Sequence, residues 1–477
     1  YKMIRILKKI KRNKMRCLKL RFSFLALVVS CCALNAQNFS MDEFMMEVRK
    51  NHPVAKQAMI GVDKAKAELL ASRGGFDPIL AIQNENKTFD GKNYFYYTNH
   101  ELKIPTWPGI DFKAGVENNG GQFINSEFST GKTSYLGLEI PLARNLLMDK
   151  RRAQVQQAKL MVSMSEQDRL QALNNLMFDA TLTYLNWAGT NMLYNLLTKF
   201  VSVSNDRLRL VRIAWQQGDR PAIDTSEALA QLQSFQMMQA EGFVRLQNAA
   251  LDISNFLWTE QDIAYLVPTS YFPDSVKVFR PEDELLLETM LLRSSNENPA
   301  LLVYNIKLDA LNVERKLKFQ GLLPYFNLKA NLLNSGYNVT KGVGGAFLEN
   351  NYKLGFDFKI PLRLSEGRGD YRMAKLKIQE TNFQLNNKRW EVENKIKTYY
   401  NETQALQQQI ILAEGALKNF TALLRAEELR YQNGESSLFL INARENKVLE
   451  TTQKLIELKV KWLKARYATE WAAGLLR

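Results

Sequence analysis

Few side chains in this 477-residue chain could carry out catalysis or hold a metal ion. The sequence contains two histidines, His52 and His100, and three cysteines, all within the first 36 residues. Zinc and related metals bind clusters of His and Cys, and a histidine-based catalytic triad would have to use one of these two histidines. Neighbouring acids such as Glu427 and Glu428 fall on a predicted helix, where solvated carboxylates are the simplest interpretation. The sequence therefore predicts no enzyme, no metal site and no cofactor.

The N-terminal segment has the composition of an export signal. Ten of the 64 Lys and Arg residues lie within residues 1–36, which contain no Asp or Glu, so most of the net charge of +15 is here. A basic region followed by an apolar stretch too short to span a bilayer, residues 22–34, is typical of a secretory signal. Two processing routes are open: cleavage after Ala36, or lipidation of Cys31. Because the basic charge is mainly a targeting feature, no nucleic-acid partner is predicted.

Two very long helices must organise the rest of the chain. Residues 142–220 contain no proline and two glycines, Gly189 and Gly218, and an apolar seam with alternating spacings of three and four runs from Leu173 to Trp215. A similar seam runs from Ile396 to Leu424. Such spacing is typical of helices packed as in coiled coils. About 70 helical residues would extend roughly 100 Å, so the first helix indicates an elongated protein.

Landmarks recur in the same order along the chain, which indicates an internal tandem duplication. They are the paired sequences around Pro53 and Pro299, Pro78 and Pro324, Pro141 and Pro361, and Gly218 and Gly434. The spacing from Pro78 to Pro141 exceeds that from Pro324 to Pro361 by 26 residues. This difference places one insertion, an extra hairpin, in the first β region. Gly218 and Gly434 are interpreted as turn or C-cap glycines where each long helix ends and a returning helix begins.

The repeat predicts four consecutive parts of the chain. They are a signal and upstream basic segment at 1–36, a first repeat at 37–259, a connector at 260–297 and a second repeat at 298–477. The first repeat is predicted to contain strands at about 76–142, a long helix at about 148–217 and a return helix at about 221–258. The second is predicted to contain strands at about 324–362, a long helix at about 368–432 and a return helix at about 435–474.

The β regions alternate apolar and polar residues. Residues 352–360 are apolar at every second position, and residues 324–333 and 136–140 alternate in the same way. Strands of about ten residues with one apolar and one polar face suit a transmembrane β-barrel with a wet lumen. A half-buried sheet would show the same alternation, but the export signal and the lack of a spanning helix favour the barrel. The aromatic residues 94–97 could join an interfacial girdle or pack within the extra hairpin.

These elements and their order resemble the TolC-like outer-membrane efflux proteins, over roughly residues 39–474. The resemblance implies an α+β membrane protein. In it, long antiparallel coiled-coil hairpins form an α-barrel, and each chain of a homotrimer gives four strands to a twelve-stranded transmembrane β-barrel in outer-membrane lipid. It also implies a passive channel that extends into the periplasm. Such a channel conducts small molecules or secreted protein, as in type I secretion, and docks a periplasmic adaptor protein and an inner-membrane pump. The alternative is an exported coiled-coil structural or adaptor protein without a pore.

The resemblance further suggests a periplasmic gate at the helix-hairpin tips marked by Gly218 and Gly434. Two gate positions of the family match Asp224 and Tyr431. Ser436 and Ala443 stand where the family's gate has an arginine and an aspartate. The charged neighbours that could substitute are Glu435, Arg444 and Glu445. Without the resemblance, Asp224 would be a carboxylate that stabilises the start of a helix, and Tyr431 a seam residue.

Overall fold

The computed structural model describes residues 37–124, 129–268, 271–274, 287–337 and 351–476. They form two compact units. The helical unit comprises described residues within 1–52, 179–283 and 402–465, and the sheet unit those within 53–178, 284–401 and 466–477. The predicted export signal and Cys31 lie outside the described residues.

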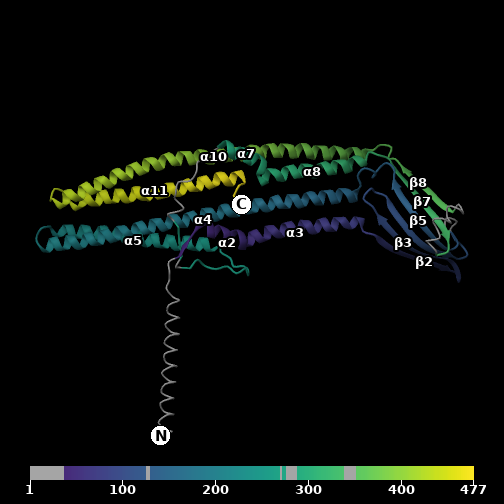
Figure 1. The fold of residues 1–477 in the computed structure, drawn as a ribbon, viewed down its shortest axis with the longest axis horizontal. Helices are drawn as coiled ribbons and strands as arrows, with labels where there is room; N and C mark the ends of the chain where they lie inside the picture. The colour runs from purple at the N-terminus through teal and green to yellow at the C-terminus, as the bar shows by residue number, and fades with distance from the viewer. Residues whose placement is uncertain (1–36, 125–128, 269–270, 275–286, 338–350, 477) are drawn as a thin grey trace, which may run out of the picture. The chain divides into compact units, whose positions relative to one another are not determined.

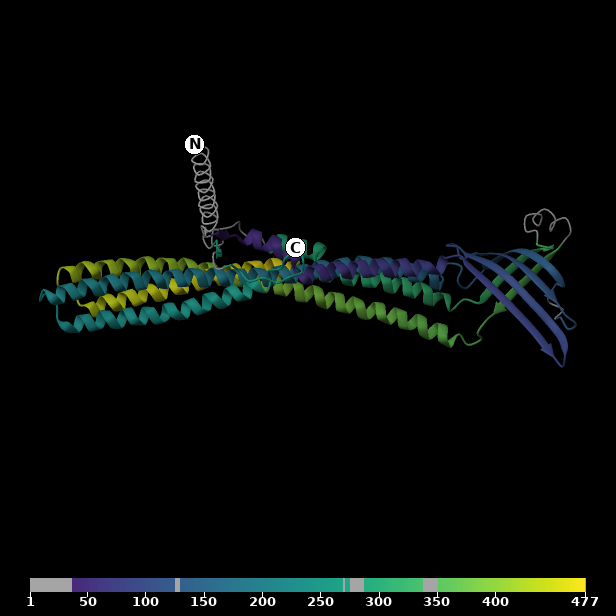
Figure 2. The same ribbon diagram turned by 90° about the horizontal axis from the view of Figure 1, so that it is seen from below.

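Four helical segments of the sheet unit lead into one end of its sheet (Figures 1 and 2). They are α3 (Pro53–Arg73), α8 (Pro299–Gln320), and the N-terminal parts of α4 (Lys150–Gln216) and α10 (Ser365–Gln432). Helix α7 (Leu287–Glu297) precedes α8. The Asn298 side chain caps α8 by accepting a hydrogen bond from the N–H of Ala300. Met148, Ala153 and Val313 form a buried cluster that joins α4 to α8.

Within the described residues, the sheet is antiparallel and has six strands in the order β2–β3–β4–β5–β7–β8. The strands are β2 (Ile79–Phe89), β3 (Lys92–Pro105), β4 (Asp111–Gly120), β5 (Gly131–Pro141), β7 (Tyr325–Ser335) and β8 (Tyr352–Lys359). The sheet thus has six strands where the resemblance implied four per chain, because β2 and β3 add a hairpin at one edge. Strands β5 and β7, which are far apart in sequence, pair at the centre with Gly137 opposite Asn331.

The register of the strands separates polar from apolar side chains. Ile104, Phe112, Leu138, Ala330 and Leu354 are successive cross-strand partners from β3 to β8. Because neighbouring residues in a strand point to opposite faces, the residues between these positions lie on the other face, which is polar. Four of the five apolar residues are exposed by 37–64% in the single chain. The alternation predicted from the sequence is therefore confirmed.

The aromatic residues 94–97 lie in β3 and pack within the sheet. The ring of Tyr94 lies 4.8 Å from that of Phe123. Tyr96 covers Gly120 in β4, where a β-carbon would lie 2.2 Å from the tyrosine hydroxyl. Of the two alternatives for this run, the structure supports packing in the region of the extra hairpin.

The helical unit contains two antiparallel helical hairpins. They are formed by the C-terminal part of α4 with α5 (Ala222–Ser254), and the C-terminal part of α10 with α11 (Leu438–Ala473). Seam residues Trp187, Leu197 and Leu208 are at most 5% exposed. Leu197 packs with Phe235 of α5 and Leu449 of α11 in one buried cluster. The seam thus supplies the core of this unit, as its spacing predicted.

Smaller elements complete the helical unit beside α4. Helix α2 (Met41–Asn51) follows β1 (Gln37–Phe39), which pairs in parallel with β6 (Tyr271–Pro273). The buried Tyr184 of α4 stacks on Phe44 of α2 and donates a hydrogen bond to the Phe39 carbonyl at 2.6 Å. Across the described part of the chain, no helix combines the length and the apolar character that crossing a membrane requires.

Candidate functional site

Each helical hairpin turns at a glycine that ends a long helix. Gly218 has φ 81° and Gly434 has φ 79°. The N–H of Gly218 donates to the Trp215 carbonyl at 3.0 Å, and the N–H of Asp219 donates to the Ala214 carbonyl at 2.9 Å. The equivalent bonds follow α10 at 3.0 and 2.9 Å. This is the Schellman motif, whose left-handed residue is most often glycine because glycine has no β-carbon to clash.

Arg220 and Tyr431 join the two hairpin tips. The Arg220 guanidinium lies 4.1 Å from the centre of the Tyr431 ring, and its Nη2 donates to the Tyr431 carbonyl at 2.9 Å. The arginine thereby makes a cation–π contact and also satisfies a carbonyl at the negative C-terminal end of α10. Tyr431 also packs against the buried cluster that contains Leu208, Leu232 and Leu438. Tyr431 therefore both packs in the seam and makes a polar contact with Arg220.

Asp224 lies in the first turn of α5, where a carboxylate interacts favourably with the helix dipole. Burial raises the pKa of the Tyr431 phenol; the charge of Arg220 lowers it, and that of Asp224 raises it. Asp224, one of the two residues that the sequence singled out at the tips, thus lies near enough to Tyr431, the other, to affect its pKa, and Arg220 makes the direct contact between the hairpins. Their grouping supports a polar contact point at the tips, and their role in gating stays a prediction.

Ser436 and Arg444 converge on Glu427, whose side chain is 8% exposed. The Ser436 hydroxyl donates to Oε1 of Glu427 at 2.5 Å. Arg444 Nε lies 4.0 Å from Oε2, and Arg430 Nη1 lies 3.8 Å from Oε1. At the position where the resemblance implied an arginine, the chain therefore places a hydroxyl that hydrogen-bonds a buried acid. Glu435, the other predicted neighbour, is exposed and contributes its backbone N–H to the Schellman motif.

Glu445 of α11 is paired with Arg207 of α4. Arg207 Nη1 lies 2.5 Å from Glu445 Oε2, and Nη2 lies 3.0 Å from Oε1. The Glu445 side chain is 3% exposed and that of Arg207 14%. Arg207 was not among the site residues predicted from the sequence, although it begins the stretch through Gly218 to Asp224 that contributes to the family resemblance. Its place directly before the seam residue Leu208 was the available signal, because a charge beside a seam faces the neighbouring helix.

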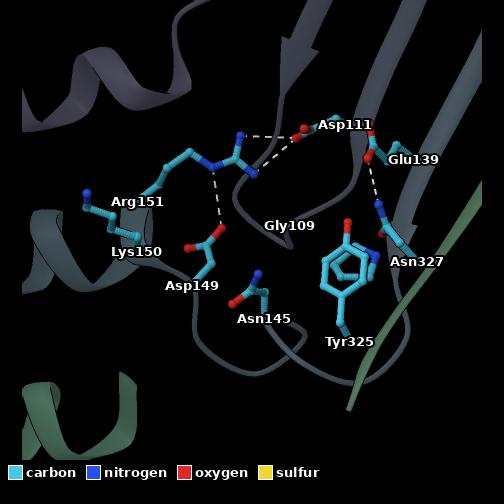
Figure 3. A pocket seen from close by; sticks show the side chains of 10 residues that line it. Gly109, Asp111, Glu139, Asn145, Asp149, Lys150, Arg151, Tyr325 and Asn327 are labelled. Carbon is cyan, nitrogen blue, oxygen red and sulfur yellow. Dashed lines mark hydrogen bonds and ion pairs between the residues drawn. The ribbon is translucent and has the colours of Figure 1, made fainter. Parts of the chain in front are cut away.

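A second group of charges lies on the polar face of the sheet, where β4 and β5 approach α4 (Figure 3). Asp111 accepts hydrogen bonds from both terminal nitrogens of Arg151 at 3.1 Å, and Lys103 Nζ lies 2.9 Å from its other oxygen. Glu139 lies 2.8 Å from Lys113 Nζ. Asp111, Glu139 and Arg151 line a pocket of about 260 Å³. Opposite charges are thus paired across strands, which leaves a charged but nearly balanced surface.

The turn between β3 and β4 contributes Gly109 to the lining of this pocket. The N–H and the hydroxyl of Thr106 both donate to the Ile110 carbonyl, at 3.2 and 2.6 Å. The Trp107 ring lies 5.3 Å from that of Phe76. Gly109 has φ 88°, and a β-carbon there would lie 3.2 Å from Arg152 Nη2. The turn is therefore fixed against the start of α4. Sequence reasoning placed no site residue here.

Comparison with known proteins relates the chain to outer-membrane channels. Residues 292–474 match the model of the outer membrane efflux protein family. No curated protein sequence matches the chain. Among solved structures, the open state of the MtrE outer membrane channel of Neisseria gonorrhoeae aligns with a TM-score of 0.62 at 13% identity, over 91% of this chain and 89% of that one.

Two further outer-membrane protein structures have the same fold. The CmeC outer membrane channel of Campylobacter jejuni gives a TM-score of 0.61 at 16% identity, over 91% of this chain and 85% of that one. The outer membrane protein VceC of Vibrio cholerae gives 0.60 at 16% identity, over 91% and 95%. Together with the family match, these structures confirm the resemblance inferred from the sequence. The family is one of passive channels and not of enzymes, as predicted.

Proposed function

We propose that this chain, which belongs to the outer membrane efflux protein family through residues 292–474, is a passive channel that acts as a homotrimer in the outer membrane. It conducts small toxic molecules or secreted protein that an inner-membrane pump delivers through a periplasmic adaptor. The cargo is chosen by the pump, because a passive conduit offers little selection of its own.

The two-faced sheet is the observation that carries this proposal. One face presents a continuous row of apolar side chains from Ile104 to Leu354, which suits contact with lipid. The other presents paired charges such as Lys113 and Glu139, which suit a water-filled lumen. Both edges of the sheet have unpaired backbone groups, which hydrocarbon does not tolerate. Neighbouring copies of the chain would satisfy them.

The helical unit supports the same reading. Large apolar side chains remain exposed near the tips, including Ile223 (72%) and Phe439 (68%). Exposed apolar groups of this size on a helical hairpin suit contact with further helices, either from neighbouring copies or from an adaptor. We assign the gate to the contact between Arg220 and Tyr431, which joins the two tips of one chain, and to the nearby charge of Asp224.

The test is purification of the full chain from outer membranes followed by recording in planar lipid bilayers. We expect a trimer that resists detergent until heated, and discrete single-channel currents. A strain lacking the protein should become sensitive to drugs, bile acids or metals, or should lose proteins from its secretome. A soluble periplasmic monomer without conductance would instead favour the alternative, an exported coiled-coil structural or adaptor protein.

A further inference from the structure

We infer that the β2–β3 hairpin is an integral part of the membrane barrel, so that three copies close a barrel of eighteen strands where the resemblance implied twelve. This inference rests on the proposed function, because it takes the shared trimeric barrel as given. It concerns the width of the pore and which strands meet at the boundary between copies.

The hairpin continues the sheet without a break. Residue pairs from Ile79↔Lys103 to Phe89↔Lys92 join β2 to β3, with one register shift after Lys87. Residue pairs from Tyr96↔Gly120 to Pro105↔Asp111 join β3 to β4. The β3–β4 ladder is one residue pair longer than the ladder between β4 and β5. Backbone pairing therefore makes β3 a full member of the sheet.

Side chains on the polar face also make contacts that require β3 to be in the sheet. The ring of Tyr135 in β5 lies across Gly115 in β4, where a β-carbon would lie 2.4 Å from the ring. Its hydroxyl donates to Glu101 Oε2 in β3 at 2.7 Å. Tyr135 is only 5% exposed as a result. A tyrosine that reaches across a glycine to the next strand but one would lose its hydrogen-bond partner if β3 left the sheet.

The helix-proximal end of the hairpin is anchored as well. Lys103 in β3 pairs with Asp111 at 2.9 Å, and Asp111 in turn accepts both bonds from Arg151 of α4. The turn that follows β3 packs on Phe76 through Trp107. The hairpin thus contacts both the sheet and the helices of its own unit, as a strand pair that forms part of the barrel would.

The directions of the two edge strands allow copies of the chain related by rotation to pair edge to edge and close a barrel. In an antiparallel sheet with an even number of strands, the two edge strands, β2 and β8, run in opposite directions. Strand β8 of one copy can therefore pair antiparallel with β2 of the next. Gln83, Glu85 and Lys87 of β2 lie on the same face as Lys353 and Asp357 of β8, so the polar lining would continue across the boundary. Every residue of β2 is exposed in the single chain.

A wider pore follows from this strand number. Barrel diameter grows roughly linearly with the number of strands, so eighteen strands give about one and a half times the width of twelve. Barrels of about 16–18 strands leave an open aqueous channel. The hairpin would therefore set the size of cargo that passes the outer membrane.

Disulfide trapping identifies the strand that lies beside β8 of the neighbouring copy. Residues 37–477 contain no cysteine, so the natural chain provides a clean background. One panel combines Gln83→Cys, Glu85→Cys or Lys87→Cys in β2 with Lys353→Cys or Asp357→Cys in β8. A second panel combines Lys113→Cys or Glu117→Cys in β4 with the same β8 changes. The oxidation control is Glu85→Cys with Tyr97→Cys, which are direct partners within one hairpin.

Three outcomes are distinguishable on denaturing gels of oxidised outer membranes. Covalent trimers from the β2–β8 panel support the eighteen-stranded barrel. Covalent trimers from the β4–β8 panel overturn it in favour of twelve strands and leave the proposed channel intact. If the control pair forms its intrachain disulfide but neither panel links copies, both the strand number and the shared barrel are rejected.

Discussion

Arg207 and Glu445 are 238 residues apart in sequence, and their side chains form a two-contact ion pair at 2.5 and 3.0 Å. The Glu445 side chain is 3% exposed, so the ion pair with Arg207 offsets part of the cost of burying it. The pair joins α4 of the first hairpin to α11 of the second. It is therefore a specific link between the two halves of the sequence within the helical unit.

Removing one partner of this pair should be costly. We expect Glu445→Ala to lower the free energy of unfolding by up to about 3–5 kcal/mol, because the largely buried Arg207 guanidinium keeps only the longer contact to Glu428, at 3.8 Å. Thermal unfolding of the purified protein, followed by circular dichroism, measures the change. The control is Glu450→Ala, which breaks an exposed i,i+3 pair with Lys447 and should cost about 0–1 kcal/mol. The double variant Arg207→Met/Glu445→Leu should recover most of the loss, and equal losses in all three variants would contradict this account.

The tip glycines should resist replacement because of their backbone conformation alone. At Gly218 and Gly434 an added β-carbon meets nothing within 4 Å, and φ is 81° and 79°. We therefore expect Gly434→Ala to destabilise by about 1–2 kcal/mol through left-handed strain. The matched control is Gly415→Ala in α10, which has the same open space without a positive φ. It should stabilise by about 0.5–1 kcal/mol, so a loss at Gly415 similar to that at Gly434 would argue against the explanation.

The tip contact should depend on the Tyr431 ring and not on its hydroxyl. Arg220 contacts the face of the ring and the backbone carbonyl, and both survive in Tyr431→Phe. We expect this variant to conduct as the natural protein does in planar bilayers. Tyr431→Ala and Arg220→Ala remove a contact worth about 0.5–2 kcal/mol and should increase the open fraction of the channel. If Tyr431→Phe also increases the open fraction, the contact that keeps the channel closed must involve the Tyr431 hydroxyl.

His52 should make the helical unit less stable in acid. Its imidazole lies 5.7 Å from the Phe256 ring and 6.4 Å from the Trp258 ring, and burial lowers its pKa below the usual 6.5. A lowered pKa means that the unfolded chain binds the proton first. The stabilisation that neutral His52 gives the folded chain is thus complete above about pH 6.5. It is lost as the pH falls from there through the lower pKa that His52 has in the folded chain. Unfolding of wild type and His52→Gln across this range should show a smaller pH dependence in the variant.

The two faces of β8 should respond differently to the same new charge. Leu354 belongs to the apolar row and its neighbour Lys353 to the polar face. We expect Leu354→Arg to destabilise the barrel by up to about 2–4 kcal/mol, the cost of a charge near the middle of the lipid. Lys353→Arg should leave stability almost unchanged. Urea unfolding in lipid vesicles compares the two variants, and equal stabilities would exclude lipid contact at Leu354.

The sequence by itself determined the local elements of this protein. Seam spacing predicted the helices that became α4 and α10, alternation predicted strands such as β8, and Gly218 and Gly434 marked the helix ends. These patterns are readable because each reports the period of one element or the conformation of one residue. The same local patterns, placed in order, were enough to suggest the family. The duplication remains a prediction from that order.

Only the tertiary structure decided which distant segments meet. The extra hairpin was visible as 26 surplus residues, but its addition to the sheet, which makes six strands, depends on pairing between β3 and β4 that no local period specifies. Arg207 and Tyr135 were likewise ordinary residues until Glu445 and Glu101 were found beside them. Local periodicity fixes which face a residue occupies, whereas its partner is fixed by contacts across hundreds of residues.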